Sequence, residues 1–308
     1  MSFDDGFILG LSLGGGGGGS SYVNNDPDYA LYKALPEPAA NQAVILIRIA
    51  NVVQHNYISV HYDPEIPDED ITENEGTVDW GDGQTSNIGN NPSVYTYHSY
   101  SEPGDYIITV TDNSGGKIES VCSRKKTNYA YPIAMKVGAS LVYDDGLGSK
   151  YINSTSDFKY IQFASGYIWE NGFVFNGSQK LTRLDFLGNT KPYELINNLF
   201  RSCNALDFDN LMPMFADVIA VGNYSIYQCY NLKKLDLPNC ASVGNYSVYQ
   251  CYALKEVNLP LCTSVGQNSL SYNYALNKAI LPDSCNYGSG AFKYSYCLIP
   301  TPNGIYPY

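Results

Sequence analysis

The chain has few charged residues, and basic ones are especially scarce. Charged residues make up 16% of its 308 residues, against about 25% in average globular proteins. Lys and Arg number 18 and Asp and Glu 30, which gives a formal net charge of -12. A nucleic-acid-binding protein draws on clustered Lys and Arg, so this class is excluded. No apolar run approaches the ~18 residues of a membrane-spanning helix, and the scarcity of basic residues argues against an electrostatic membrane anchor.

The first residues also lack the pattern of a secretory leader. Residues 7–13 are apolar, but Asp4 and Asp5 stand where a leader has basic residues, and no small-residue cleavage site follows. We predict instead that residues 1–35 form an extended N-terminal attachment segment. The glycines at 14–19 allow two interpretations, a flexible hinge or a backbone threaded between partner subunits. The attachment residues that we expect are Phe7, Ile8, Leu9, Leu11, Leu13, Gly14 and Gly19.

Tryptophan and phenylalanine are few, whereas tyrosine is abundant. The chain has 2 Trp and 11 Phe but 29 Tyr, together with 28 Gly. This composition is typical of a mostly β surface protein rather than of a helical enzyme. The length predicts two or three domains.

Two strand patterns and an acidic stretch begin the middle of the chain. Residues 43–49 are apolar and residues 57–62 alternate, and both patterns predict strands. Nine acidic residues and no basic one lie between Asp63 and Asp82, which predicts a solvated loop. A calcium site is a more specific alternative to a solvated loop, because this ion binds several carboxylate oxygens. The fixed residue spacing of an EF-hand is absent, however. We predict no metal ligand, and calcium at this loop stays an open alternative.

Three motifs follow in order: residues 78–83 (VDWGDG), 97–100 (YHSY) and 103–111 (PGDYIITVT). The glycines of the first motif suit a tight turn, Trp80 suits a core, and the third motif alternates as a strand. Together they resemble a PKD-type domain. The resemblance implies an immunoglobulin-like β-sandwich over residues 36–125 that acts as a spacer. In that motif His98 is a structural hydrogen-bonding residue, and no nucleophile or carboxylate accompanies it as a catalytic base would require.

The C-terminal half contains a repeat of twenty-two residues. Segments 221–238, 243–260 and 265–282 align with glycine, leucine and proline at matching positions. A fixed period with an L-x-x-L-x-L core is the signature of a leucine-rich repeat solenoid, which we expect over residues 151–308 after a connector at 126–150. Degenerate earlier turns contain Phe158, Ile161, Phe163, Leu181, Leu184, Phe186, Leu206 and Leu211.

The repeats resemble the BspA-type leucine-rich repeat. Ser225-Ile226 and Ser247-Val248 occupy the A-F position of that pattern, Cys229 and Cys251 occupy its cysteine, and Asn273 replaces the third cysteine. Because one coil cannot bury its apolar face alone, its apolar residues should stack on their equivalents in the next coil. The residues predicted to point inward are Ile226, Cys229, Leu232, Leu235 and Leu237.

The eight cysteines are predicted to be free thiols. The pairs Cys229/Cys251 and Cys240/Cys262 are each separated by one period, so they should lie on neighbouring rungs. Their side chains would run parallel, which fits disulfide geometry poorly, and buried thiols pack well as small apolar groups. Zinc is disfavoured because no C-x-x-C pair or nearby His exists.

Tyrosines between the inward positions should face outward. Tyr and Asn are favoured in antibody paratopes, and rows of Tyr would also suit sugar rings. The alternative is that the rows only stabilise neighbouring rungs through aromatic pairs. The candidate binding residues are Tyr224, Tyr227, Tyr230, Tyr246, Tyr249, Tyr252, Tyr272 and Tyr274.

Together these patterns predict a mostly β, non-enzymatic protein without a cofactor, because no motif provides the paired carboxylates of a glycosidase. The missing leader fits a virion protein, because such proteins leave the cell by lysis. The opening residues also resemble the N-terminal residues of some bacteriophage structural proteins. That resemblance implies a tail or other surface appendage that attaches to other virion proteins through its N-terminus and binds a host-surface glycan or protein. A bacterial cell-surface adhesin is the alternative. We expect a homo-oligomer or part of a larger assembly, with no nucleic-acid or membrane partner.

Overall fold

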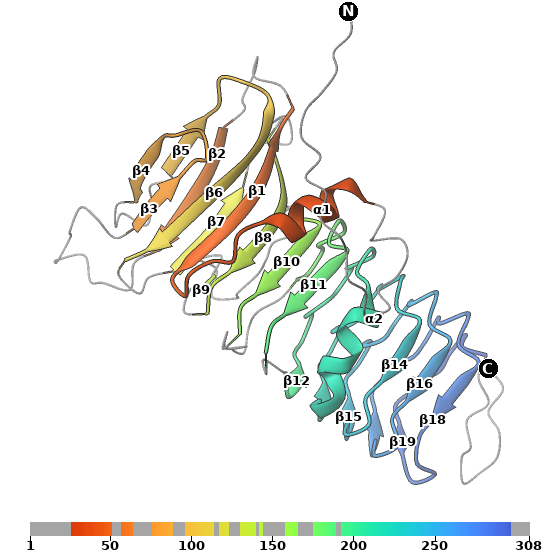
Figure 1. Cartoon of the computed structure of the whole chain (residues 1–308). Helices are drawn as coiled ribbons and strands as arrows, with labels where there is room; N and C mark the ends of the chain where they lie inside the picture. The colour runs from red at the N-terminus through yellow and green to blue at the C-terminus, as the bar shows by residue number, and fades with distance from the viewer. Residues whose placement is uncertain are drawn as a thin grey trace, which may run out of the picture.

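The computed structural model describes residues 26–50, 57–63, 76–88, 96–113, 117–122, 130–139, 142–143, 158–165, 175–188 and 192–296. The chain is mostly β with few helices, as predicted. Long antiparallel strands form one end of an elongated molecule, and short parallel strands form a stack of coils at the other (Figure 1). The residues predicted for attachment, at positions 7–19, lie outside the described ranges.

A seven-stranded sheet runs through the first end and into the coils, in the order β11-β10-β8-β1-β6-β3-β4. Pairing is antiparallel from β4 to β8 and parallel from β8 through β10 to β11. The strands are β1 (Gln42–Ile49), β3 (Gly76–Asp79), β4 (Thr85–Ile88), β6 (Gly104–Asp112), β8 (Ala130–Val137), β10 (Tyr160–Phe163) and β11 (Arg183–Phe186). Strand β8, which lies within the predicted connector, therefore joins the antiparallel strands to the first coils by continuous hydrogen bonding.

A second sheet has the order β5-β2-β7-β9. Its strands are β2 (Tyr57–Asp63), β5 (Thr96–Ser99), β7 (Lys117–Cys122) and β9 (Val142–Tyr143). The predicted strands at 43–49 and 57–62 are thus confirmed as β1 and β2. None of the helices in the described ranges has the length and apolarity that crossing a membrane requires.

Strand β1 is buried on both faces, which explains its unbroken apolar sequence. Ile45 and Ile47 lie in the main core with Trp80, whereas Val44 and Leu46 belong to a second core cluster. That second cluster is closed by helix α1 (Pro27–Ala34), whose Tyr32 is fully buried. The main core continues without interruption from β1 into the coils.

The hairpin of β3 and β4 takes the form that its sequence predicts. Gly81 and Gly83 have φ values of +78° and +87°, in the left-handed region that glycine tolerates. Trp80 is fully buried, and its indole N–H donates to Ser86 Oγ at 2.9 Å. The ring of His98 stacks on Trp80, and its Nε2 forms a hydrogen bond with Asp82 Oδ2 at 2.8 Å, which fits the structural hydrogen-bonding role predicted for this histidine but shows that a carboxylate does accompany it. The acidic stretch is not a loop over its whole length, because residues 76–79 pair with β6.

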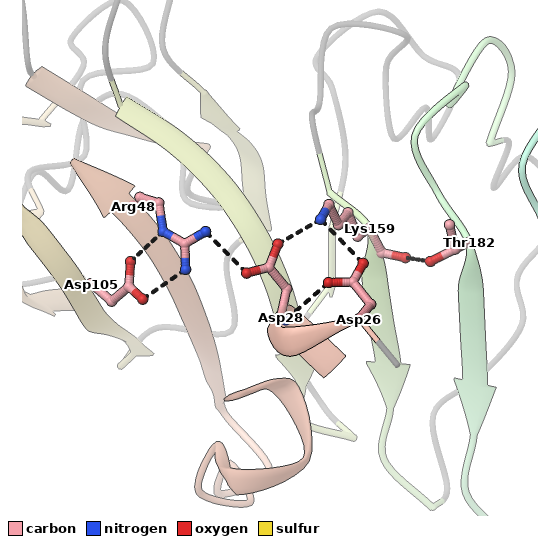
Figure 2. A network of polar contacts seen from close by, with 6 residues as sticks. All are labelled: Asp26, Asp28, Arg48, Asp105, Lys159 and Thr182. Carbon is pink, nitrogen blue, oxygen red and sulfur yellow. Dashed lines mark hydrogen bonds and ion pairs between the residues drawn. The ribbon is translucent and has the colours of Figure 1, made fainter. Parts of the chain in front are cut away.

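Helix α1 crosses the junction between the two ends of the molecule (Figure 2). Asp28 binds Arg48 of β1 at 3.0 Å and Lys159, next to β10, at 2.5 Å. Asp26 caps the helix by accepting from the Asp28 backbone N–H, and it also binds Lys159 at 3.2 Å. Arg48 in turn holds Asp105 of β6 at 2.7 Å. One short helix therefore ties antiparallel strands to the first parallel strand.

Aromatic and polar contacts extend this junction to β11. The ring of Tyr32 stacks on Tyr160 of β10 with a centroid distance of 5.2 Å, and its hydroxyl donates to Asp185 of β11 at 2.6 Å. The buried ammonium of Lys136 on β8 binds the Leu35 carbonyl and Glu37, both just after the helix. We call these residues together with the ion pairs of Asp26 and Asp28 the α1 junction.

The coils form two parallel ladders along the solenoid axis. One five-stranded ladder consists of β12 (Glu194–Leu195), β13 (Ala220–Val221), β15 (Ser242–Val243), β17 (Ser264–Val265) and β19 (Asn286–Tyr287). The other consists of β14 (Lys234–Asp236), β16 (Glu256–Asn258) and β18 (Lys278–Ile280). Strands pair in register with a shift of twenty-two residues, so the predicted period is confirmed in space. One earlier coil is four residues longer, and it contains the short helices α2 (Phe208–Leu211) and η2 (Met212–Asp217).

The residues predicted to point inward are all buried. The six cysteines whose side chains are described are buried and free, which confirms the prediction for them. The glycine shared by the repeats marks a close approach between coils. A Cβ atom at Gly244 would lie 2.7 Å from the backbone nitrogen of Asn223 in the previous coil, too close for any side chain.

Candidate binding face

The predicted tyrosines lie on turn segments between the two ladders. These segments are residues 196–204, 222–230, 244–252, 266–274 and 288–296, and we call their outer surface the tyrosine face. Backbone hydrogen bonds join each segment to the next: the N–H of Ile226 donates to the Ser247 carbonyl, and the N–H of Val248 donates to that of Ser269. Side chains one period apart therefore form straight columns along the axis.

The tyrosine rings stack on one another within these columns. The centroids of Tyr224 and Tyr246 are 5.2 Å apart with ring planes 1° from parallel. The pairs Tyr227/Tyr249 and Tyr230/Tyr252 have centroid distances of 5.2 and 5.0 Å and nearly parallel planes. Tyr274 continues the last column at 5.6 Å from Tyr252. The ladder that the sequence offered as one alternative is thus present.

This stacking changes what the face offers to a ligand. A ring that is stacked on both sides has its π faces covered, so only its edge and hydroxyl remain for contact. A sugar ring therefore cannot stack on Tyr252, which lies between the rings of Tyr230 and Tyr274. The face presents phenol hydroxyls and amide groups, which bind by hydrogen bonding.

The column that contains Tyr224 and Tyr246 has a left-handed backbone conformation. Tyr224 and Tyr246 have φ values of 56° and 52°, where Asn198, Asn268 and Gly290 occupy the equivalent positions of other coils. Asn and Gly adopt this region readily, but a bulky residue there is strained. Ring stacking along the column offsets part of this cost. Nothing in the composition of the repeat indicates this conformation for a tyrosine.

Amide side chains form two further columns beside the rings. Asn223 Oδ1 accepts from the Asn245 backbone N–H at 2.7 Å, and Asn245 Oδ1 accepts from that of Gln267 at 2.8 Å. Gln228 Nε2 donates to Gln250 Oε1 at 2.8 Å. The face is therefore held in place by bonds between coils that repeat at each rung.

A column of polar side chains also runs through the interior below this face. The thiols of Cys203, Cys229 and Cys251 each donate to a carbonyl of the preceding coil at 3.0 Å. Asn273 takes the next position and donates to the carbonyls of Val248 at 2.8 Å and Leu270 at 2.9 Å. The substitution of asparagine for the third cysteine thus preserves the donor.

A neighbouring interior column is not satisfied in this way. Ser225, Ser247 and Ser269 are fully buried, and among the described residues their hydroxyls have no hydrogen-bond partner. They occupy the position at which the family pattern has alanine. A buried hydroxyl without a partner costs stability.

Exposure along the face increases toward its C-terminal end. Of the predicted residues, Tyr252 and Tyr274 are 40% and 49% exposed, and the other six are half-buried. The sequence interpretation missed Tyr294 and Tyr296, which are 43% and 67% exposed in the last described coil. The last coil is less similar in sequence to the full repeats, so these two tyrosines were not included. Both lie twenty-two residues after Tyr272 and Tyr274, so the period could have identified them.

The cations of the face were missed as well. Arg201 lies over the rings of Tyr224 and Tyr227, with its guanidinium carbon 5.5 and 5.4 Å from their centroids. Lys293 lies over Tyr294 at 5.1 Å. Burial and neighbouring tyrosines raise the pKa of Tyr249 to about 12, so its hydroxyl is neutral at physiological pH. Within the described ranges, no three His, Cys, Asp or Glu side chains gather closely enough to hold a metal ion.

Comparison with known families identifies the coils. The family described as the BspA type leucine rich repeat region matches residues 172–299 in six copies. The C-terminal region carries BspA-type leucine-rich repeats. Two solved structures are similar. A leucine-rich repeat protein of T. pallidum has 18% identity and a TM-score of 0.41, over 56% of this chain and 78% of that one. A leucine-rich repeat protein from Bacteroides ovatus has 15% identity and a TM-score of 0.35, over 54% and 47%. No curated protein matches the chain.

Proposed function

We propose that the protein is a non-enzymatic adhesin-type binding protein of the bacterial cell surface whose solenoid presents the tyrosine face to a ligand. The observation that carries this proposal is the tyrosine face itself. It is built from BspA-type repeats, which are typical of binding or adhesion proteins, and it lines up tyrosine and amide side chains over successive coils. Exposed tyrosines give a large contact area at a low cost in side-chain entropy.

The family match favours the cell-surface location over the phage particle that the sequence also suggested. BspA-type repeats are typical of surface or extracellular proteins, whereas the residues predicted to attach to a virion lie outside the described ranges. The prediction of an extended attachment segment over residues 1–35 is wrong for residues 27–34, which form helix α1 and pack on the core of this chain. Attachment to partner subunits through the residues before α1 and assembly as an oligomer remain part of the proposal.

In this proposal the antiparallel sheets act as a PKD-type spacer. The hairpin with buried Trp80, the stacked His98 and the bond from the Tyr100 hydroxyl to the Trp80 carbonyl at 2.9 Å support that resemblance. A spacer needs no cleft, and its role is to carry the solenoid away from the surface.

Binding assays with the full chain test the proposed function. The probes are a panel of purified acidic and neutral polysaccharides and a panel of purified extracellular-matrix proteins. A variant with Tyr252→Ser, Tyr274→Ser and Tyr296→Ser removes the three exposed rings of one column of the face. Tyr193→Ser, which removes a tyrosine that is 72% exposed outside the face, is the matched control.

We expect binding to at least one probe, a loss of at least about tenfold in affinity for the triple variant, and no change for the control. Circular dichroism of each variant checks that the coils remain folded. Failure of the folded full chain to bind any probe, or equal binding by the triple variant, would overturn the proposed function.

A further inference from the structure

The charge of the tyrosine face differs from that of the whole chain. The chain has 30 acidic and 18 basic residues, yet the five segments of the tyrosine face contain no Asp or Glu. The charged residues in these segments are Arg201 and Lys293. A surface whose charged residues are all cations is suited to binding an anion, although the whole protein has a net charge of -12.

Within the described structure these two cations contact tyrosine rings but are not neutralised by a carboxylate. Among the described residues neither Arg201 nor Lys293 has an ion-pair partner, and both are exposed. The ladder of β14, β16 and β18 shows the contrast. There Lys234 binds Asp236 at 3.0 Å, and Lys278 binds Glu256 at 2.8 Å. Charge is thus neutralised on that side of the coils and left available on the tyrosine face.

The two cations belong to one column. Positions 201, 227, 249, 271 and 293 are equivalent in successive coils, so Arg201 and Lys293 are four rungs apart, or about 19 Å at ~4.8 Å per rung. Between them lie the half-buried Tyr227 and Tyr249, whereas Ser271 is fully buried and its hydroxyl donates to the Gly290 carbonyl. An anion that engages both ends must therefore be extended, and it must make hydrogen bonds over the distance between them.

The repeated tyrosine and amide columns of the tyrosine face favour a polymer of identical polar units. A peptide presents a different side chain at each position, and the known modes of peptide recognition use a strand edge, an apolar groove, aromatic ring faces, a cluster of Arg for acidic motifs, or a backbone nest for a chain terminus. Arg201 and Lys293 lie about 19 Å apart and do not form such a cluster. The tyrosine face is formed by turns rather than by a strand edge, and stacking covers one ring face in each tyrosine pair and both ring faces of Tyr252. Edge-on phenols and amides instead match the hydroxyl groups of a polysaccharide.

We infer that the tyrosine face binds an extended acidic polysaccharide, with Arg201 and Lys293 contacting its carboxylates and the columns between them bonding to its hydroxyls. This inference rests on the proposed function and specifies the ligand of the same face. Arg suits a carboxylate because its guanidinium provides two parallel donors, and Lys provides a point charge.

The test measures affinity of the full chain for three polymers of similar length. Polygalacturonate is the acidic polysaccharide, its fully methyl-esterified form is the neutral match, and poly-L-glutamate is the acidic peptide. The variant Arg201→Gln/Lys293→Gln removes both cations of the face. Lys233→Gln/Lys255→Gln removes two cations of the solenoid outside the face and is the matched control. A second variant, Arg201→Lys, keeps the charge but loses the paired donors.

We expect polygalacturonate to bind at least about tenfold more tightly than either other polymer. The double variant should lose at least about tenfold in that affinity, Arg201→Lys should lose less, and the control should stay within about twofold. Affinity should also fall as salt increases. Equal binding of the methyl ester, preferred binding of poly-L-glutamate, or an unchanged affinity of the double variant would overturn the acidic-polysaccharide inference. If another probe then binds in a manner that depends on Tyr252, Tyr274 and Tyr296, the proposed function stands.

Discussion

The two ends of the molecule are stabilised in different ways. The antiparallel end depends on contacts that occur once, such as the burial of Trp80 and the α1 junction. The solenoid depends on contacts that recur at each coil, such as the Asn223 and Asn245 bonds and the stacked rings. A single substitution should therefore remove much of the stability of the first end, whereas in the solenoid the damage is shared with neighbouring coils.

The substitution Trp80→Ala should have the largest effect. It removes a fully buried ring, its stacking on His98 and its bond to Ser86, which predicts a loss of about 3–5 kcal/mol in the free energy of unfolding. The matched solenoid variant Leu254→Ala should lose about 2–5 kcal/mol, with less loss of secondary structure outside its own coils. Urea titration followed by circular dichroism measures both. A loss below about 0.5 kcal/mol for Trp80→Ala, as at ordinary surface sites, would contradict the role given to the hairpin.

Asn273→Ala should be the most damaging polar substitution in the solenoid. It leaves the carbonyls of Val248 and Leu270 and the N–H of Cys251 without their present partner, at about 1–3 kcal/mol for each buried group that finds no other. Asn273→Cys should lose much less because it restores the thiol of the preceding coils. Thermal unfolding of the two variants distinguishes these outcomes. Equal losses would mean that hydrogen bonding in this column contributes little.

Tyr32→Phe tests the α1 junction with little change in shape. The variant removes the bond from the Tyr32 hydroxyl to Asp185 and should lower the free energy of unfolding by about 1.5–3 kcal/mol, because the acceptor is charged. The nearby Tyr29→Phe keeps that bond and is the control. Hydrogen exchange should show faster opening of α1 in Tyr32→Phe alone. Unchanged protection of α1 would show that the bond does not hold the helix.

Ser247→Ala should stabilise the protein, in contrast with the other variants. The substitution removes a buried hydroxyl without a partner among the described residues and keeps the shape of the family's alanine, so a gain of about 1 kcal/mol is expected. The same change at Ser225 and Ser269 should add to it. Calorimetry of the single and triple variants measures the gain. A decrease in melting temperature would indicate that these hydroxyls bind something in solution.

Acid should weaken the α1 junction. Burial alone would raise the pKa of Asp26, but hydrogen bonds from the Asp28 N–H, Tyr160 and Lys159 outweigh it and lower the pKa. A lowered pKa contributes stability above the unfolded value of 3.8, and this is lost as the pH falls through the folded pKa. Hydrogen exchange of α1 between pH 5 and 3 measures the effect, and Asp26→Asn should remove most of it. The same pH dependence in that variant would assign the effect to other carboxylates.

The sequence predicted the solenoid well because its information is local and repeated. The inward positions from Ile226 to Leu237, the free thiols and the strand with Ile45 and Ile47 were all predicted from spacing. The hairpin around Trp80 was predicted from turn chemistry. Each of these features is specified by residues within one period of each other.

Features that depend on distant pairs were not predictable in this way. The pairing of β8 with β10 and the packing of Tyr32 on Tyr160 join segments with no shared pattern. Ring orientation was also hidden, because spacing places Tyr224 above Tyr246 but does not tell whether faces or edges point outward. The left-handed φ of Tyr246 lies outside the usual preferences of tyrosine, so propensity could not indicate it.

The position of α1 also has a mechanical consequence. Helix α1 is the first element of the described fold, so tension applied to its N-terminal end acts first on α1. The helix is bonded to β1 through Arg48 and to the start of β10 through Lys159, and thus to both ends of the molecule. A pulling force is therefore divided between the antiparallel strands and the coils before any strand is peeled from its sheet. The seven-stranded sheet is then loaded as a unit, which delays extension of the chain under load.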